Sequence, residues 1–243
     1  MVENHPIHLL KEFDSLYRLR PVRDNTGGMK SGHMFHAWSI IKNLKPKTLI
    51  ESGVWKGLGT WFFEKASPST NIISIDPYMG SREYISPAVD YRTEDFLSTD
   101  WSMLDKENSL VFFDDHQDCI PRLKKCKELG FKKIVIEDNY PWQQGDCYSP
   151  KKIFSNRDYI IDSGGIRKLH KKNEDDYNFL RDSIKTYKEM PPIFKPHKTR
   201  WGDDWDSEYP TPAPILELSS SSEYPVFFDE RFDYTWICYL ELK

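Results

Sequence analysis

The sequence predicts an α/β fold, in which a mostly parallel sheet carries helices on both faces. Two observations lead to this fold class. From Leu44 onward, short apolar runs alternate with amphipathic stretches, which is typical of strands joined by crossover helices. Each of four such runs also ends in an acidic residue, and the carboxyl ends of parallel strands form the ligand-binding edge of a sheet of this kind. The 243 residues, 14% of them aromatic, suffice for one domain with a sizeable core.

Four apolar runs are the predicted core strands, at Thr48–Ile50, Asn71–Ile75, Ser109–Phe113 and Lys133–Ile136. The acidic residues that end them are Glu51, Asp76, Asp114 and Glu137. Apolar residues at helical spacing and a glycine stop predict helices over Gly32–Leu44, Gly57–Ala66 and Ile120–Leu129. The four acidic residues are therefore expected along one edge of the sheet.

We expect a single domain over residues 1–243. Its predicted parts are an N-terminal helical or lid segment (1–47), a cofactor-binding core (48–150), an irregular insertion or lid (151–214) and closing strands (215–243). The insertion is rich in proline and includes a predicted helix over Asp175–Glu189, and its Trp201 and Trp205 suit either an acceptor site or core and dimer contacts. Two predicted strands, Pro225–Phe228 and Tyr234–Leu240, form an antiparallel hairpin at the C-terminus.

Composition narrows the class of protein. The net charge of -4 argues against a broad basic surface for nucleic acid. No apolar run approaches the ~18 residues that a membrane span requires, and the N-terminus lacks the pattern of a signal peptide. The four cysteines form no CxxC pair, so we expect reduced thiols in a soluble cytoplasmic protein. The oligomeric state stays open, with a homo-oligomer as one alternative.

A glycine-rich segment follows the first predicted strand. Gly53, Gly57 and Gly59 stand where the strand turns into a helix, so the backbone can approach a ligand closely. Their spacing is GxxxGxG, which disfavours the GxGxxG site of dinucleotide-binding folds. Together with Asp76 at the end of the next strand, this turn predicts a site for a nucleoside. A phosphate site is the alternative, because Lys56 lies within the turn.

These residues resemble the first motifs of class I S-adenosylmethionine-dependent methyltransferases, in which an acidic residue and a glycine-rich turn follow the first strand. The resemblance covers about Thr48 to Asn139 and implies a Rossmann-like sheet with S-adenosylmethionine as cofactor. It places Glu51, Gly53 and Gly57 in the cofactor motif. Asp76 corresponds to the acid that binds the ribose hydroxyls, since a carboxylate accepts from two adjacent hydroxyls. Asp95 and Phe96 fall where the family contacts adenine.

A second group of acidic residues follows the last two parallel strands. Asp114 and Asp115 come after one strand, and Glu137 and Asp138 after its expected neighbour. Such a gathering of carboxylates is unfavourable unless a cation or protons neutralise it. Oxygen ligands without a thiolate favour Mg²⁺, Mn²⁺ or Ca²⁺ over Zn²⁺. The sequence therefore predicts a divalent-cation site beside the nucleoside site.

This second arrangement resembles the metal-dependent sugar O-methyltransferases of macrolide and aminocoumarin biosynthesis (the macrocin, mycinamicin and aminocoumarin type). The resemblance implies Asp114, Glu137 and Asp138 as ligands of Mg²⁺ or Mn²⁺, with Asp115 as an alternative first ligand. His116 stands where that family has an acidic base, and its ordinary pKa is near neutral. The implied reaction is methyl transfer to a hydroxyl of a sugar or sugar nucleotide, with Asp114 and His116 as catalytic residues.

Other interpretations remain open on the sequence alone. A metal-dependent hydrolase or phosphoryl-handling enzyme, or a non-catalytic nucleotide-binding module, would use the same acidic edge. The segment Asp24–Met29 is interpreted as a plain turn, with closure over the cofactor as the alternative. His33 and His36 are interpreted as ordinary residues of an amphipathic helix, because neither has a partner at metal-ligand spacing.

Overall fold

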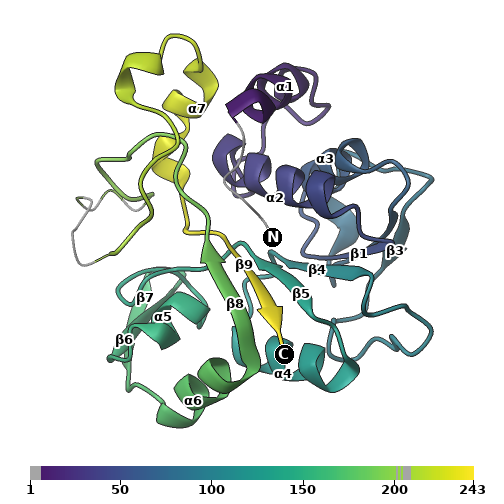
Figure 1. Cartoon of the computed structure of the whole chain (residues 1–243), viewed down its shortest axis with the longest axis vertical. Helices are drawn as coiled ribbons and strands as arrows, with labels where there is room; N and C mark the ends of the chain where they lie inside the picture. Colours follow the sequence, from purple (N-terminus) through teal and green to yellow (C-terminus); the bar gives the residue numbers. More distant parts are fainter. Residues whose placement is uncertain (1–6, 201, 203, 205–208) are drawn as a thin grey trace.

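The computed structural model describes residues 7–200, 202, 204 and 209–243. Trp201 and Trp205 lie outside the described residues. A seven-stranded sheet forms the centre of the molecule, and a separate two-stranded hairpin, β6 and β7, lies beside it (Figure 1). The strands are β1 Thr48–Ser52, β2 Asn71–Ile75, β3 Asp90–Arg92, β4 Ser109–Phe113, β5 Lys133–Ile136, β6 Tyr159–Ser163, β7 Ile166–His170, β8 Ile184–Glu189 and β9 Cys238–Leu242.

The strand order of the sheet is β3-β2-β1-β4-β5-β9-β8. The strands from β3 to β5 pair in parallel, whereas β9 runs antiparallel to both of its neighbours. Strand β1 is the first strand in the sequence but lies inside the sheet, with β2 on one side and β4 on the other. The strand order therefore reverses direction at β1. The predicted mostly parallel, Rossmann-like sheet is confirmed.

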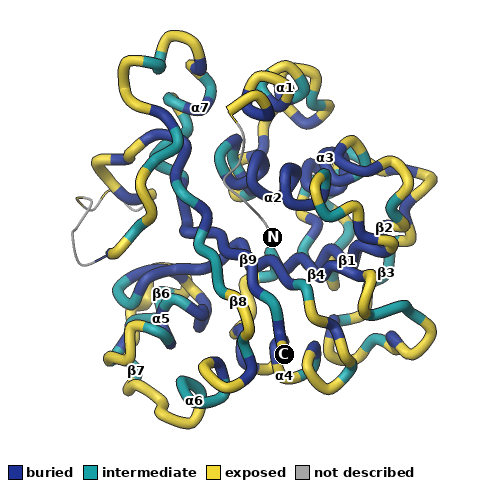
Figure 2. The backbone as a smooth tube through the Cα atoms, in the orientation of Figure 1, coloured by how far each residue is buried: buried dark blue, intermediate teal, exposed yellow. Residues whose placement is uncertain are grey.

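Helices cover both faces of this sheet, as predicted. The helices are α1 Ile7–Arg18, α2 Ser31–Leu44, α3 Leu58–Ala66, α4 Cys119–Leu129, α5 Pro150–Phe154, α6 Glu174–Ser183 and α7 Pro225–Asp229. Buried residues of α1, α2, α3 and α7 form one apolar core with one face of the sheet, and those of α4, α5 and α6 form a second core with the other face. Figure 2 shows the buried strands enclosed by helices with exposed outer turns.

The alternation of side chains along the strands explains the two cores. Leu49 in β1 points to the first core and its neighbour Ile50 to the second, and Leu110 and Val111 in β4 divide in the same way. Because both faces are covered, the central parallel strands are mainly apolar, and β1 and β4 are buried along their whole lengths. This is why the sequence shows short continuous apolar runs.

The predicted C-terminal hairpin is corrected in one respect. Pro225–Phe228, predicted as a strand, lies in helix α7, where Pro225 occupies the first turn and supplies a backbone angle that suits a helix start. Strand β9 instead pairs antiparallel with β5 on one side and with β8 on the other. The predicted helix over Asp175–Glu189 ends at Ser183, and the remaining residues form strand β8. The alternating Ile184-Lys185-Thr186-Tyr187 favours an extended chain there.

The segment 151–214 is less irregular than predicted. It contains most of α5, the hairpin of β6 and β7, helix α6 and strand β8 before the proline-rich part begins. The hairpin turns at Gly164-Gly165, where both residues have positive φ angles. Asn173 caps α6, since its side chain accepts hydrogen bonds from the backbone of Asp175 and Asp176.

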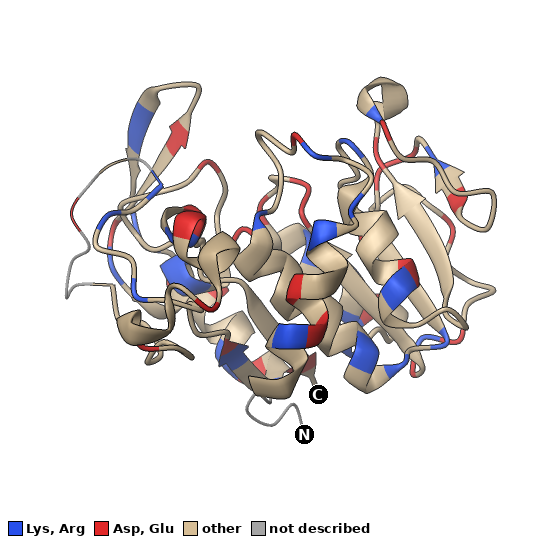
Figure 3. Cartoon of the chain, turned by 90° about the horizontal axis from the view of Figure 1, so that it is seen from above, with Lys and Arg blue, Asp and Glu red and all other residues tan. Residues whose placement is uncertain are grey.

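The surface carries mixed charge. Figure 3 shows Lys and Arg interspersed with Asp and Glu over the helices. Among the described residues, no helix combines the length and apolar character that crossing a bilayer requires. Both findings agree with the sequence, which shows neither a broad basic face nor a long apolar run.

The aromatic core around Phe13 gives a test of the fold. The Phe13 ring is fully buried and lies 5.0–5.8 Å from the rings of Tyr17, Phe35, Trp38, Phe62 and Phe227, so it joins α1 to α2, α3 and α7. We expect Phe13→Ala to lower the free energy of unfolding by about 3–5 kcal/mol, measured by urea denaturation. Met103→Ala, at a 93% exposed position, is the control and should change it by less than about 0.5 kcal/mol. Equal stability of the two variants would contradict this packing.

Candidate active site

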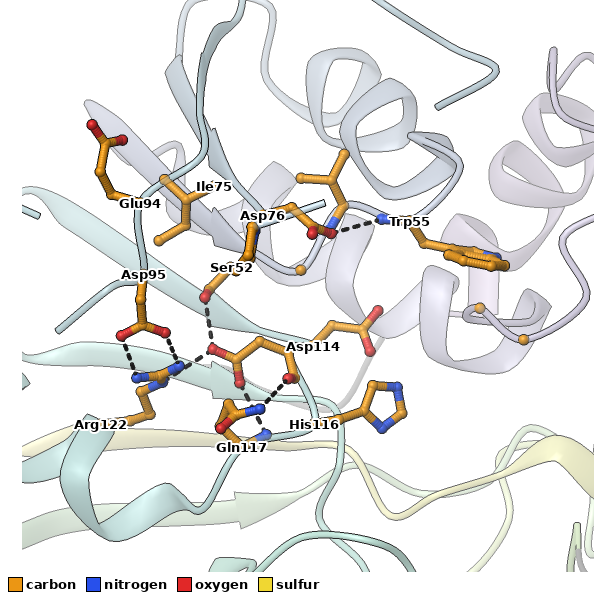
Figure 4. Close-up of a pocket in the computed structure, with 16 residues that line it drawn as sticks. Ser52, Trp55, Ile75, Asp76, Glu94, Asp95, Asp114, His116, Gln117 and Arg122 are labelled. Carbon is orange, nitrogen blue, oxygen red and sulfur yellow. Dashed lines mark hydrogen bonds and ion pairs between the residues drawn. The ribbon is translucent and has the colours of Figure 1, made fainter. Parts of the chain in front are cut away.

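The carboxyl ends of β1, β2, β4 and β5 meet at one edge of the sheet. The register aligns Ser52 with Ile75 and Phe113, and Phe113 with Ile136, so the residues that follow these strands lie side by side. A pocket of about 360 Å³ opens at this edge (Figure 4). Its lining includes Gly53, Asp76, Asp95, Asp114 and His116. The two groups of residues singled out in the sequence therefore belong to one site.

The glycine turn after β1 fits tightly against the end of β4. Gly53 has a φ angle of +94°, and a Cβ atom there would lie 1.9 Å from the backbone oxygen of Asp114. Gly57 precedes the first residue of α3 with a φ of +83°, and a Cβ there would meet the backbone oxygen of Tyr84 at 2.5 Å. Both positions require glycine. Only Gly53 of the two lines the pocket.

Asp76 holds the glycine turn in place. Its Oδ2 accepts hydrogen bonds from the backbone N–H groups of Val54 (3.0 Å) and Trp55 (3.3 Å), and its Oδ1 accepts from that of Tyr78 (2.8 Å). The carboxylate thus links the end of β2 to the turn after β1, and it also lines the pocket.

Glu51 lies beneath this turn instead of in the pocket. Its side chain is buried, and its Oε2 accepts hydrogen bonds from the hydroxyls of Thr60 and Ser74, both at 2.6 Å. Burial raises the pKa of Glu51 to about 7, although these two hydrogen bonds oppose the shift. The predicted cofactor residue therefore ties β1 to β2 and α3 from inside the core.

Asp95 and Phe96 take different places. Phe96 is fully buried and packs on Trp101, Phe113 and Phe131, so its side chain lies in the core and does not line the pocket. Asp95 lines the pocket and forms a bidentate ion pair with Arg122, with N–O distances of 2.9 and 2.6 Å.

Arg122 is a site residue that the sequence analysis missed. Its Nε donates to Asp115 at 3.1 Å, and the same Asp115 oxygen accepts from the hydroxyl of Ser52 at 2.7 Å (Figure 4). Asp115 is therefore neutralised by Arg122, which removes it as the alternative first metal ligand. A signal was present in the sequence: Arg122 lies between Cys119 and Leu123 on the apolar face of a helix, where a cation requires a buried partner.

Asp114, His116 and Asp138 form a compact cluster. One ligand atom from each lies within 4.8 Å of the others. Burial and the neighbouring Glu137 raise the pKa of both Asp114 and Asp138 well above the ordinary value, because these carboxylates repel one another. Asp138 accepts from the hydroxyl of Tyr140 (2.7 Å) and the backbone of His116 (3.2 Å).

The carboxylate of Asp114 receives no hydrogen bond from any described residue, and it faces the pocket (Figure 4). The two carboxylates at this spacing suit a divalent cation that prefers oxygen ligands, such as Mn²⁺ or Mg²⁺. The donor set of the cluster therefore fits the predicted ion.

His116 is held by a carboxylate that the sequence analysis did not consider. Its Nδ1 lies 3.0 Å from an oxygen of Asp146, and the ring is about half exposed. The hydrogen bond to Asp146 and the charge of Asp138 raise the pKa of His116 to about 10. The residue has a φ of +53°, a conformation that is uncommon outside glycine, asparagine and aspartate.

Glu137 contacts helix α2 as well as the cluster, because its carboxylate interacts with His33 and with Asp138. Its Oε1 lies 2.6 Å from Nδ1 of His33 and accepts from the hydroxyl of Thr235 at 3.0 Å, while Nε2 of His33 accepts from the backbone N–H of Thr235 at 2.7 Å. Nδ1 of His33 therefore carries the proton given to Glu137. Although burial alone would raise the pKa of Glu137, the contact with His33 lowers it to about 2. His33 is thus more than an ordinary helix residue.

The segment Asp24–Met29 closes one side of the pocket, against its interpretation as a plain turn. Gly27 and Gly28 line the pocket opposite Asp114 and Asp115. The indole N–H of Trp55 donates to the backbone oxygen of Thr26 at 3.1 Å, and Lys56 donates to that of Asp24 at 2.7 Å. The glycine turn thereby fixes this segment over the pocket.

The similarities to known proteins are structural. No protein-family model matches the sequence, and no curated protein matches it. A putative S-adenosylmethionine-dependent methyltransferase from Listeria monocytogenes is similar at 14% identity over 88% of this chain and 98% of its own, with a TM-score of 0.45. The methyltransferase PaMTH1 of Podospora anserina, solved with S-adenosylhomocysteine, is similar at 18% identity over 56% of this chain, with a TM-score of 0.41.

The chain spans 64% of the length of the Podospora protein. The O-methyltransferase TomG of Streptomyces achromogenes, solved with S-adenosylmethionine, is similar at 14% identity over 56% of this chain and 68% of its own, with a TM-score of 0.40. These three structural neighbours are described as methyltransferases. At such low TM-scores the similarities carry no argument about the reaction of this chain, which has to be argued from its own residues.

The buried Glu51 gives a test based on pH. Because its pKa is about 7 in the folded protein and near 4.5 when exposed, unfolding releases a proton between these values. Folding stability should therefore fall as the pH rises from about 4.5 to about 7, by about 3 kcal/mol from this group. We expect Glu51→Gln, whose amide oxygen accepts from both hydroxyls, to lack this loss.

The measurement is urea denaturation of both proteins at pH 5 and pH 8. The difference in stability between wild type and variant isolates Glu51 from the other groups that titrate. A difference that stays constant between the two pH values would show that Glu51 is already ionised in the folded protein at pH 5.

Proposed function

We propose that this protein is an S-adenosylmethionine-dependent O-methyltransferase that acts on a hydroxyl of a sugar or sugar nucleotide with the help of a divalent cation. One observation carries the proposal. The pocket that contains Asp76 and the glycine turn also contains Asp114 and His116 of the acidic cluster. A nucleoside cofactor and a metal-bound acceptor would then lie side by side at the strand ends, where open α/β sheets bind their ligands.

The proposed cofactor site is the glycine-turn side of the pocket. S-adenosylmethionine, when bound, supplies an electrophilic methyl group, whose bond to sulfur breaks with the electron pair left on sulfur. Asp76 is proposed to accept from the ribose hydroxyls, and Asp95, held by Arg122, to contact the base. Gly53 lets the backbone approach the ligand, while Glu51 and Gly57 support the turn from below. Phe96 supports this wall from the core.

The proposed cation site is the acidic cluster. A divalent cation, when bound, lowers the pKa of a coordinated hydroxyl and neutralises the carboxylates. Asp114 and Asp138 are the proposed ligands, because their charges are close together and Asp114 receives no hydrogen bond from a described residue. Glu137, whose Oε1 is engaged by His33 and Thr235, is proposed to contribute its charge from the adjacent position.

His116 is proposed to accept the proton of the acceptor hydroxyl as the new bond between oxygen and the methyl carbon forms. Asp146 orients the imidazole through Nδ1, which leaves Nε2 for the proton. The raised pKa of His116 belongs to the protein without a cation. The hydrogen bond to Asp146 contributes most to that shift, and the charges of Asp138 and Asp114 add to it; a bound cation would offset the contribution of these two carboxylates.

Two other observations bear on the alternatives. Lys56 pairs with Glu83 at 2.8 Å and does not line the pocket, which counts against a phosphate site in the glycine turn. The four cysteines are free and buried, which supports our proposal of a reducing, cytoplasmic location.

A substitution of Asp114 tests the proposed cation site separately from the proposed cofactor site. We expect the wild-type protein to bind both S-adenosylhomocysteine and Mn²⁺ in calorimetry. Asp114→Asn should weaken Mn²⁺ binding by more than about tenfold, because it removes a ligand charge, and change the affinity for S-adenosylhomocysteine by less than about threefold. Asp90→Asn, at the far edge strand β3, is the matched control.

Wild-type protein that fails to bind S-adenosylhomocysteine at millimolar concentration would end the methyltransferase proposal. If Asp114→Asn folds normally but loses affinity for S-adenosylhomocysteine and Mn²⁺ to the same extent, Asp114 is not a specific ligand of the cation.

The role of His116 is tested by turnover. Methyl transfer from labelled S-adenosylmethionine to a panel of sugars and sugar nucleotides should be detectable with Mn²⁺ or Mg²⁺ and abolished by EDTA. We expect His116→Asn to lower turnover by about 10²–10⁴ and to keep Mn²⁺ affinity within about threefold, because the base is lost but the ligands stay. Asparagine is chosen because it tolerates the positive φ at this position. An Mn²⁺ affinity that falls together with turnover would make His116 a metal ligand.

A further inference from the structure

A second and larger cavity lies in the proline-rich part of the chain, outside the pocket described above. Its volume is about 860 Å³, and five of its lining residues are prolines: Pro192, Pro196, Pro210, Pro212 and Pro214. Among the described residues that line it, the charged or titratable ones are Lys195, His197, Arg231 and Tyr209, and none of them is a carboxylate. We call this cavity the basic groove. It belongs to the green-to-yellow segments that stand beyond the end of β8 in Figure 1.

The basic character of this groove is unusual for this protein. The chain as a whole has more acidic than basic residues, 38 against 34. Among the described residues, no carboxylate lies within 4.0 Å of a nitrogen of Lys195 or Arg231, whereas Lys56, Arg122 and Lys151 each form an ion pair with a carboxylate. A groove lined by unneutralised cations attracts an anion.

Arg231 is fixed in a conformation that suits a ligand. Its guanidinium lies over the rings of Phe228 and Phe232, at 3.8 and 4.1 Å from the ring centres, and donates one hydrogen bond to the backbone oxygen of Phe228. The edge of the His197 ring packs on Phe232 at 4.7 Å. A guanidinium has five N–H donors, so several remain for a ligand. Because the side chain is already held in place, a ligand does not have to restrict its conformation on binding.

The wall of the groove contacts the segments that hold the acidic cluster. Tyr209, which lines the groove, donates to the side chain of Gln143, in the loop that follows Asp138. Thr211, another lining residue, accepts from the indole N–H of Trp236, whose neighbour Thr235 donates to Glu137. The groove and the cluster are therefore joined through these shared segments.

We propose that the basic groove binds the phosphate of a phosphorylated acceptor, so that the acceptor is a sugar phosphate ester rather than a neutral sugar. This inference rests on the proposed function, because it assigns the acceptor of that same site. Phosphate fits better than a carboxylate or an apolar partner, since it offers several acceptor oxygens to Lys195, His197 and Arg231 together. A sugar monophosphate and a nucleoside diphosphate sugar share this chemistry.

The test is calorimetry with four probes: inorganic pyrophosphate, glucose 1-phosphate, UDP-glucose and glucose. EDTA is present throughout, so that phosphates cannot bind through a metal at the acidic cluster. We expect wild-type protein to bind pyrophosphate and at least one of the phosphorylated sugars at least tenfold more tightly than glucose, with an affinity that falls as salt rises. Tighter binding of glucose 1-phosphate would indicate a sugar monophosphate as the ligand, and tighter binding of UDP-glucose would indicate a nucleotide-linked sugar.

The double variant Lys195→Ala/His197→Ala removes two exposed groups from the groove and should weaken pyrophosphate binding at least tenfold. The matched control is Lys168→Ala, on the exposed strand β7. Binding of S-adenosylhomocysteine and Mn²⁺ should be unchanged in both variants, since neither position lines the pocket.

Three results would overturn the inference: wild-type protein that does not bind pyrophosphate, a double variant that binds it as tightly as the control, or glucose binding as tight as that of its phosphate. Failure of the proposed function looks different. In that case S-adenosylhomocysteine does not bind, while the loss of pyrophosphate binding in the double variant still identifies a phosphate site in the groove.

Discussion

The close approach of two backbones at Gly53 is the constraint on which the site depends. The turn after β1 lies against the end of β4, where the Asp114 N–H donates to the Ser52 oxygen at 2.8 Å. No side chain fits between them, because even a Cβ at Gly53 would meet the Asp114 oxygen. This contact brings the proposed cofactor wall and the acidic cluster into one pocket. A wider gap between β1 and β4 would separate the proposed methyl donor from the acceptor.

The carboxylates around this contact differ in the partners that compensate their charges. Asp115 has Arg122, Glu137 has His33, and Asp76 has three backbone N–H groups. Asp114 and Asp138 are left close together without a matching cation of their own, apart from the His116 proton. The acids at the sheet edge are therefore of two kinds: those with a structural partner, and the pair Asp114 and Asp138, whose charges face each other and are only partly compensated. That pair is where an added ion lowers the electrostatic energy most.

The sequence predicted the parallel strands and the acids at their ends, because burial on both faces and strand-end position leave a local pattern. It did not predict the partner of β9, since pairing with β8 is decided between distant segments. It also did not predict the contact between Glu137 and His33, because this contact joins distant segments, and the Thr235 that completes the network lies 202 residues from that histidine. Glu51 shows the same limit, as its two hydroxyl donors come from a helix and a neighbouring strand.

The clamp on the segment Asp24–Met29 has a consequence for how ligands enter and leave. Trp55 and Lys56 fasten this segment through its backbone oxygens, so two hydrogen bonds and not a hinge of free glycines hold it shut. Opening the pocket on that side would break both of these hydrogen bonds. Entry and exit of ligands past this segment would therefore depend on two residues of the glycine turn itself.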